Sequence, residues 1–208
     1  MKSLNGLREL LARGDYRFSD PQIELEQYNT PVDIASFCVW NAHLNGDIAN
    51  KVVLDLGSGT GILSHTCGLV GAAHVVGVEI DGSAIRKAVE ENLWATSTDF
   101  VQTQVSPHTL SNMFRVKFDV AITNPPFGTK NQEHADTVFI REALSVSNVV
   151  YSFHLSKSFE FLQDWSQREF VGVTMNLVAR VDYPMEKIYR KHRQQVKLVK
   201  VDILRWSV

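Results

Sequence analysis

Four adjacent residues, Asn124-Pro125-Pro126-Phe127, combine the groups needed to hold a flat amino group. The side-chain oxygen of Asn124 can accept one hydrogen of such an amine, and the backbone carbonyl of Pro125 can accept the other. Prolines lack an N–H and fix φ, so this carbonyl is presented in a stiff geometry. Phe127 can stack on an aromatic ring that carries the amine. The tetrapeptide predicts a site for a planar nitrogen, although these residue types also form rigid turns.

Such a site suits the methylation of an exocyclic amine, whose lone pair is delocalised into its ring. A sulfonium donor supplies the electrophile, so neither a metal nor a strong general base is required, and positioning carries most of the rate enhancement. The tetrapeptide resembles the (D/N/S)-P-P-(Y/F/W) motif of amino-methyltransferases. Those enzymes act on adenine N6, cytosine N4, guanine N2 or glutamine side-chain amides. The motif restricts the acceptor to a planar nitrogen and does not choose among these.

A glycine-rich loop over residues 55–61, Asp-Leu-Gly-Ser-Gly-Thr-Gly, follows a strand pattern and opens a helix pattern. Glycines permit a tight turn and let a ligand approach the backbone. The spacing differs from the G-x-G-x-x-G of a dinucleotide site, because Ile62 stands at the third glycine position. No Lys-Ser/Thr pair follows, which excludes a P-loop. Glu79 ends the next strand, where a carboxylate can accept hydrogen bonds from both hydroxyls of a ribose.

The loop and the acid together resemble the cofactor site of class I S-adenosylmethionine methyltransferases. The resemblance implies that Asp55 faces the amino acid end of the cofactor and that Gly57 and Gly59 line it. Asp81 is a nearby competitor for the role of Glu79, but it is better interpreted as the cap of the following helix.

The elements that must position these residues alternate between strand and helix patterns. Thr30-Pro31 is expected to start an early helix with Thr30 as its cap. Strands are expected at 51–56, 73–79, 100–101, 118–123 and 149–153, with helices at 4–13, 61–69, 81–92, 136–146 and 156–168 and β-like runs at 170–181 and 196–207. This order predicts an α/β, Rossmann-like fold: a mostly parallel seven-stranded sheet flanked by helices, with a C-terminal antiparallel hairpin. In such a sheet the ligand lies beyond the carboxyl ends of the strands, where both motifs occur.

The composition suits one soluble domain. The 208 residues are 44% hydrophobic and 21% charged, and the net charge of -2 gives no global signal for nucleic acid or membrane. Cys38 and Cys67 are too few for a disulfide framework and do not form a zinc-binding C-x-x-C pair. We expect a single domain over 1–208. Its N-terminal helical segment, 1–45, would cover the cofactor site, and residues 46–208 would form the Rossmann-like core.

Further segments narrow the family. Residues 25–30 (Leu-Glu-Gln-Tyr-Asn-Thr) precede the core, 128–130 (Gly-Thr-Lys) extend the tetrapeptide, and 150–154 and 201–206 complete the set. They resemble the methyltransferase-like protein five family, eukaryotic enzymes that place N6-methyladenosine on 18S ribosomal RNA. The implied cofactor contacts are Gln27, Thr30, Gly57, Thr60, Ile62, Glu79, Gln104 and Val105. Tyr151 and His154 are candidates for lining a base pocket.

The resemblance also implies an obligate partner and a cytoplasmic and nuclear location. The partner is a small zinc-binding activator protein, shared by several methyltransferases, that pairs with the sheet edge near residues 99–105. The chain departs from the family at Ser58 and Thr60, where cysteine is common, and at Gln104 and Glu79, where Asp is common. Gln104 keeps an oxygen that can accept from the adenine amino group, on a longer arm.

A basic stretch over residues 187–200 has two interpretations. It contains Lys187, Arg190, Lys191, Arg193, Lys197 and Lys200. Such a run is either a solvated hairpin tip or, beside a base-methylating site, a patch that binds RNA phosphates. Two alternatives to an RNA enzyme also remain open: a protein glutamine N5-methyltransferase and a non-catalytic ribosome-assembly module.

Overall fold

A seven-stranded sheet in the order β3-β2-β1-β4-β5-β7-β6 forms the centre of the computed structural model, which describes residues 1, 3–94, 96–128, 135–186 and 196–208. The strands are β1 (Val52–Leu56), β2 (His74–Glu79), β3 (Thr98–Gln102), β4 (Val120–Thr123), β5 (Val149–Leu155), β6 (Thr174–Glu186) and β7 (Val196–Ser207). Strands β1 to β5 pair in parallel, and β7 pairs antiparallel with both β5 and β6. The predicted parallel sheet with a terminal antiparallel hairpin is confirmed.

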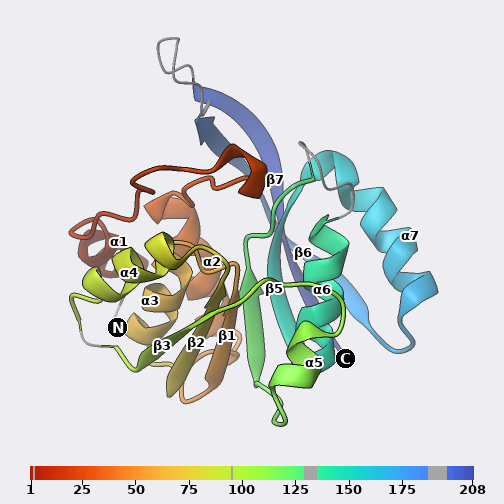
Figure 1. Cartoon of the computed structure of the whole chain (residues 1–208). Coiled ribbons are helices and arrows are strands. Elements are labelled where there is room, and N and C mark those ends of the chain that lie inside the picture. Colours follow the sequence, from red (N-terminus) through yellow and green to blue (C-terminus); the bar gives the residue numbers. More distant parts are fainter. Residues whose placement is uncertain (2, 95, 129–134, 187–195) are drawn as a thin grey trace.

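Helices cover both faces of this sheet (Figure 1). They are α1 (Leu4–Leu11), α2 (Val32–Leu44), α3 (Ile62–Leu69), α4 (Gly82–Glu90), α5 (Thr109–Met113), α6 (Ala135–Val146) and α7 (Phe159–Glu169), with 3-10 turns η1 (Ile23–Leu25) and η2 (Ser156–Ser158). Helices α1, α2 and α3 share one apolar cluster with the sheet, and α5, α6 and α7 share the other. Among the described helices, none has the length and apolar character needed to cross a membrane.

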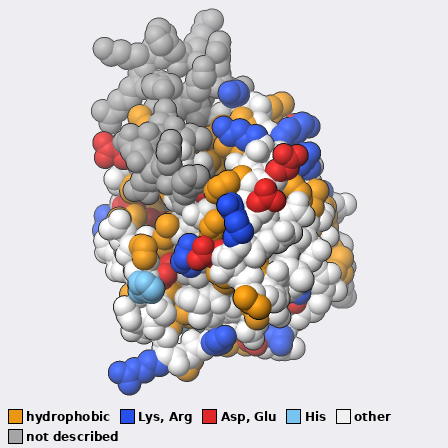
Figure 2. Space-filling view, turned by 90° about the vertical axis from the view of Figure 1, so that its right-hand side faces the viewer, with side chains coloured by type: hydrophobic (Ala, Val, Ile, Leu, Met, Phe, Trp, Pro, Cys, Tyr) orange, Lys and Arg blue, Asp and Glu red, His pale blue; other side chains and the backbone are white. Residues whose placement is uncertain are grey.

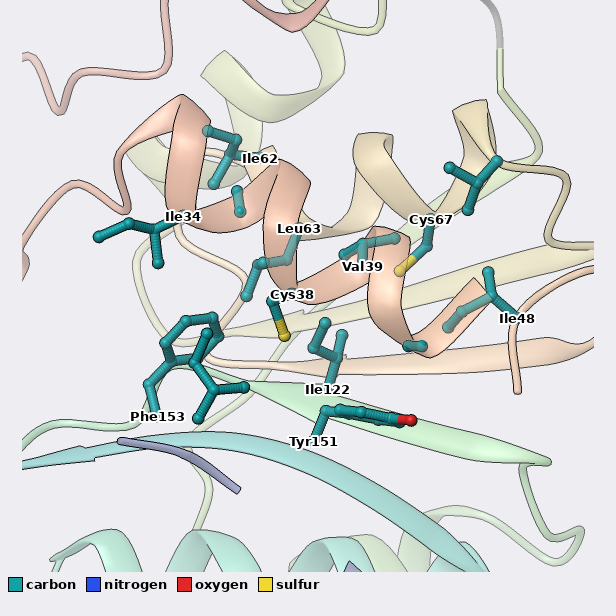
Figure 3. Packing of buried hydrophobic residues seen from close by; sticks show 14 of the residues in the cluster. Ile34, Cys38, Val39, Ile48, Ile62, Leu63, Cys67, Ile122, Tyr151 and Phe153 are labelled. Carbon is teal, nitrogen blue, oxygen red and sulfur yellow. The ribbon is translucent and has the colours of Figure 1, made fainter. Parts of the chain in front are cut away.

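The core between α2, α3 and the sheet is built from small and medium apolar side chains. Figure 3 shows Cys38 of α2 and Leu63 of α3 directed toward Ile122 of β4 and Phe153 of β5. Both cysteines of the chain are fully buried thiols, and burial raises their pKa well above the ordinary value. Close packing of this kind fixes the two helices relative to the strand ends that they precede and follow.

The order of the strands places both motif loops at one point of the sheet. The chain proceeds from β1 outward to β2 and β3, and then returns to the other side of β1 as β4. The Thr123 hydroxyl donates to the Leu56 carbonyl over 2.8 Å, so the last residues of β4 and β1 are joined directly. Ligands of open α/β sheets bind where the strand order reverses in this way.

Several local expectations change. Pro31 takes the cap position of α2 without a side-chain cap bond, so the prediction that Thr30 caps this helix is wrong. The predicted cap of α4 is confirmed, because Asp81 accepts from the Ser83 N–H over 2.8 Å. The sequence pattern placed the first strand of the hairpin at 170–181, but β6 begins at Thr174, because Phe170 still belongs to the end of α7.

Gly61 is required by both its backbone and its neighbours, which gives a prediction for stability. Its φ is +85°, and a Cβ at this position would lie 2.9 Å from Cβ of Ala88 on α4. Gly61→Ala should lower the free energy of unfolding by about 3 kcal/mol, combining left-handed strain with overpacking. Gly46→Ala is the matched control, because Gly46 has φ +78° and nothing within 4 Å of the added Cβ. Its expected loss in urea unfolding is about 1 kcal/mol, and equal losses for the two variants would contradict the role assigned to Ala88.

Candidate active site

One pocket lies at the carboxyl ends of β1, β2, β3 and β4. It is lined by Phe18, Glu24, Leu25, Glu26, Gln27, Tyr28, Gly57, Gly59, Val78, Glu79, Ile80, Thr103, Gln104, Val105, Asn124, Pro126 and Phe139. The glycine loop, the acid after β2 and the residues after β3 and β4 therefore meet in one cavity. The segment from Phe18 to Tyr28 closes it from the N-terminal side of the chain.

The glycine loop bends sharply beneath aromatic rings. The Gly57 and Ser58 amides both donate to the Val78 carbonyl, over 2.8 and 3.0 Å, which ties the loop to the end of β2. A Cβ on Gly59 would lie 2.9 Å from the ring of Phe18, and one on Gly57 would lie 3.1 Å from the ring of Phe139. Both glycines have positive φ. Side chains are thus excluded at both positions, by the positive φ and by the rings packed against them.

Glu79 is held by backbone amides at the wall of this pocket. Its Oε2 accepts from the Gly59 N–H over 2.8 Å, and its Oε1 accepts from Ile80 and Asp81 over 2.8 and 2.9 Å. Burial raises the pKa of this carboxyl against the opposing effect of those bonds. A carboxylate has roughly four acceptor positions, so the chain's own backbone already uses most of the capacity that the sequence assigned to a ribose.

The residues that the sequence predicts to contact the cofactor do not all line the same cavity. Those at the main pocket are Gln27, Gly57, Gly59, Glu79, Gln104 and Val105. Thr30 and Ile62 line an adjacent cavity, and Gln27 contributes to both. The Thr60 hydroxyl donates to the Tyr16 carbonyl, and Asp55 lies fully buried beneath the loop. Neither lines the main pocket.

Asn124 lines the main pocket and carries one side-chain acceptor that is unused among the described residues. Its Nδ2 donates to Thr30 Oγ1 over 2.9 Å and to the Tyr183 hydroxyl over 3.0 Å. Its Oδ1 is buried and accepts no hydrogen bond from the described residues. A buried acceptor without a partner is costly, so it marks a place where a ligand donor is expected. Pro126 lines the same pocket, whereas Pro125 and Phe127 do not.

Two residues that the sequence interpretation did not assign to the site support this loop. Glu26, at φ +50°, accepts from the Phe127 N–H over 3.0 Å and so links the N-terminal segment to the tetrapeptide. Tyr183 of β6 packs edge-on against the Phe127 ring, with centroids 6.2 Å apart. Glu26 stands within the segment 25–30 that carried the family resemblance. Tyr183 lies just beyond the β-like run expected at 170–181, and nothing local distinguishes it from a core residue.

Tyr151 and His154 do not line the described pockets, so their candidacy for a base pocket is not supported. Tyr151 is fully buried on the helix side, where its hydroxyl donates to Asp47 and accepts from Asn45. His154 is 1% exposed and contacts Asp136 and Ser152 through its two ring nitrogens. Both residues organise the sheet rather than the cavity.

Asp55 is a buried acid with an unusual titration. Its Oδ2 accepts from the Ser64 hydroxyl over 2.6 Å, and its Oδ1 has no partner among the described residues. Desolvation by burial raises its pKa to about 7. The unfolded chain therefore ionises Asp55 at a lower pH than the folded chain does, and stability is lost as pH rises from about 4 to 7.

Asp55→Asn should remove this pH dependence. The shift from 3.8 to about 7 corresponds to about 4 kcal/mol of folding free energy. The stability of the variant relative to the wild type should therefore rise as pH increases from about 4 to 7, in urea titrations at each pH. Because Glu79 titrates in both proteins, only the difference between them reports Asp55. A constant difference across this range would contradict the raised pKa.

Known proteins share both the sequence and this fold. The Methyltransferase small domain family model matches residues 29–148. The rRNA N(6)-adenosine-methyltransferase METTL5 of Danio rerio is 34% identical, over 91% of this chain and 92% of its own. The rRNA N(6)-adenosine-methyltransferase Mettl5 of Drosophila melanogaster is 35% identical, over 99% and 96%. The crystal structure of a candidate RNA methyltransferase from Pyrococcus horikoshii is 33% identical and aligns with a TM-score of 0.81 over 100% of this chain and 98% of its own. The chain therefore belongs to the S-adenosylmethionine-dependent methyltransferases and, within them, to the METTL5 family of rRNA N6-adenosine methyltransferases.

Proposed function

We propose that this enzyme methylates N6 of an adenosine in 18S ribosomal RNA, with the target base flipped out of its stack and its amino group held by Asn124 and Pro125. The observation that carries the proposal concerns Asn124, which lines the main pocket: its buried Oδ1 accepts no hydrogen bond from the described residues. An amino group has two hydrogens to donate, and this oxygen supplies an acceptor without displacing a bond within the protein. A base inside a helix cannot reach such an atom, which is the reason for flipping.

The residues present fit S-adenosylmethionine, the cofactor of the family. Gly57 and Gly59 line the pocket without side chains of their own, Glu79 brings a carboxylate to the wall, and Gln104 adds a side-chain amide beyond β3. When bound, the cofactor supplies an electrophilic methyl group. Asp55 contributes negative charge beneath the loop once it ionises near pH 7, and this charge favours a cationic ligand.

The contribution of the protein is to align the target amine with the methyl group. The N6 nitrogen would take the methyl group that the bound cofactor supplies and would release one of its two protons to solvent water. Asn124 Oδ1 and the Pro125 carbonyl fix the direction of the amine during this transfer. Two fixed acceptors restrict the orientation of the amine before the reaction begins. Less entropy is then lost on reaching the transition state, and such positioning can account for large rate effects.

Asn124→Ala tests this role directly. The variant should bind S-adenosylmethionine within about twofold of the wild type, while single-turnover methyl transfer to 18S ribosomal RNA falls about 100-fold, because one preorganised hydrogen bond to the reacting group is lost. Calorimetry measures the first quantity and methyl-labelled transfer the second. Asn112→Ala, at an exposed asparagine of α5, is the control. Wild-type turnover by Asn124→Ala would rule out the proposed mechanism.

The target is tested separately by mass spectrometry of nucleosides from 18S ribosomal RNA. Cells that rely on the wild-type protein should contain N6-methyladenosine that is absent when only Asn124→Ala is present. Methylation of a protein glutamine, with no change in RNA, would favour the glutamine N5-methyltransferase, which uses a similar pair of acceptors. The curated relatives that match along most of the chain favour RNA.

We expect basic side chains near the pocket to bind the phosphates of the RNA. On the face shown in Figure 2, basic and acidic side chains are interspersed with apolar ones. The basic stretch over 187–200 falls mostly outside the described residues. Within its described end, Lys197 is exposed and Lys200 pairs with Asp182 over 2.8 Å. Its role in binding phosphates stays a prediction, as does the cytoplasmic and nuclear location.

We also propose that a small zinc-binding activator protein pairs with β3, which forms one edge of the described sheet. The Thr103 N–H donates to the Glu79 carbonyl over 2.9 Å, so alternate amides of β3 face β2. The amides of Phe100 and Gln102 consequently point outward. An unpaired edge of this kind is suited to the addition of a strand from another chain.

Gln102→Pro should separate this pairing from folding. A proline here removes only an outward-facing N–H, so unfolding free energy should stay within about 1 kcal/mol of that of Gln102→Ala. Affinity for the purified activator should fall at least tenfold in the proline variant alone. Gln102→Ala is the matched control, because both changes remove the side-chain bond to the Ile80 carbonyl. Equal affinities would exclude pairing through this edge.

A further inference from the structure

A side-chain amide can serve the proposed reaction in only one of its two orientations. The oxygen and nitrogen of asparagine are almost the same size, but only the oxygen accepts a hydrogen bond. If the amide of Asn124 were rotated by half a turn, its NH₂ would face the NH₂ of the target base. The site therefore needs contacts that keep Oδ1 directed at the amino group of the target base, and nothing in the tetrapeptide itself supplies them.

Two hydroxyl groups lie beside the nitrogen of this amide. Asn124 Nδ2 lies 2.9 Å from Thr30 Oγ1 and 3.0 Å from the Tyr183 oxygen. A hydroxyl can donate as well as accept, so two neighbouring hydroxyls do not by themselves choose an orientation. The choice depends on where the hydroxyl protons are directed.

The hydroxyl proton of Tyr183 already takes part in another hydrogen bond. Its hydroxyl donates to the Asn29 carbonyl over 3.1 Å, and a phenol has only one proton to give. Toward Asn124 it can therefore act only as an acceptor, which requires Nδ2 and not Oδ1 to face it. Tyr183 is fully buried, and burial raises its pKa to about 12, so the phenol keeps its proton at neutral pH.

We propose that Tyr183 is a positioning residue for methyl transfer: by accepting from Nδ2 while donating to Asn29, it locks the Asn124 amide with its oxygen toward the target amine. This inference rests on the proposed role of Asn124. It assigns a function in the reaction to a residue of the C-terminal hairpin, 59 positions along the chain from the amide that it orients.

Tyr183→Phe removes the hydroxyl and keeps the ring that packs on Phe127. The maximal rate of methyl transfer by the complete enzyme with its activator should fall about tenfold or more, as expected for a buried donor and a carbonyl that lose their partner. The KM for S-adenosylmethionine and its binding constant should stay within about twofold. An ordinary structural defect would change stability without this separation of kcat from KM.

Tyr151→Phe is the matched control. Both tyrosines are fully buried, and each hydroxyl accepts from an asparagine Nδ2 and donates one hydrogen bond; Tyr151 accepts from Asn45 and donates to Asp47. Tyr151→Phe should lower thermal stability at least as much as Tyr183→Phe, while kcat stays at the wild-type value. Equal losses of kcat in the two variants would show that the effect of Tyr183 is one of stability alone, and would overturn the proposal.

An aspartate at position 124 removes the orientation problem, because both ends of a carboxylate accept. In the Asn124→Asp background, Tyr183→Phe should change the transfer rate by no more than about twofold, giving a non-additive double-mutant cycle. The same rate loss in both backgrounds would overturn the proposal.

A measurement on the amide itself does not depend on activity. The side-chain NH₂ of Asn124, assigned in nitrogen-15 spectra by its absence in Asn124→Ala, should exchange with solvent at least tenfold faster in Tyr183→Phe. Unchanged exchange together with unchanged kcat would overturn the proposal while leaving the role of Asn124 intact. Full activity of Asn124→Ala would instead remove the proposed function on which the inference rests.

Discussion

The hydrogen bond from the Thr123 hydroxyl to the Leu56 carbonyl joins the ends of the two central strands, and the organisation of the site depends on this junction. The junction brings the glycine loop and the tetrapeptide out of the sheet side by side. It exists because the chain places β4 next to β1 after extending the sheet to β3. Parallel pairing then forces the acid after β2 and the residues after β3 to the same edge.

Around this junction the chain closes the site with parts that are distant in sequence. The N-terminal segment contributes Phe18 over Gly59 and Glu26 against the amide of Phe127. The C-terminal hairpin contributes Tyr183 behind Asn124. Glu26 and Asn124 therefore belong both to the main pocket and to the contacts around the tetrapeptide.

The central strands could be predicted because each is a short apolar run buried on both faces, as at β1 and β5. The edge strand β3 extends beyond the expected 100–101, since its other residues are polar and look like a loop. Helix α5 was not expected, because it has only five residues. With Leu110 as its buried residue, it shows no recognisable helical repeat of apolar residues.

The site was predictable only as far as its chemistry is local. The roles of Asn124 and of the glycine loop can be inferred from the types and spacing of adjacent residues. The roles of Tyr183 and Glu26 cannot be inferred in this way, because they arise from contacts that span 59 and 101 positions of the chain. Thr30 illustrates the same limit: its position suggested a helix cap, whereas tertiary packing directs its hydroxyl to Asn124.

The bond between Tyr183 and the Asn29 carbonyl spans 154 positions, and this has a consequence for the order in which the protein becomes functional during synthesis. Chains are made from the N-terminus, and contacts between distant segments form late. The glycine loop, the strands from β1 to β5 and the tetrapeptide can all assemble while the hairpin is still inside the ribosome. The amide of Asn124 gains its second acceptor only after residue 183 has emerged. A nascent chain can thus hold most of its fold before the contacts around Asn124 are complete.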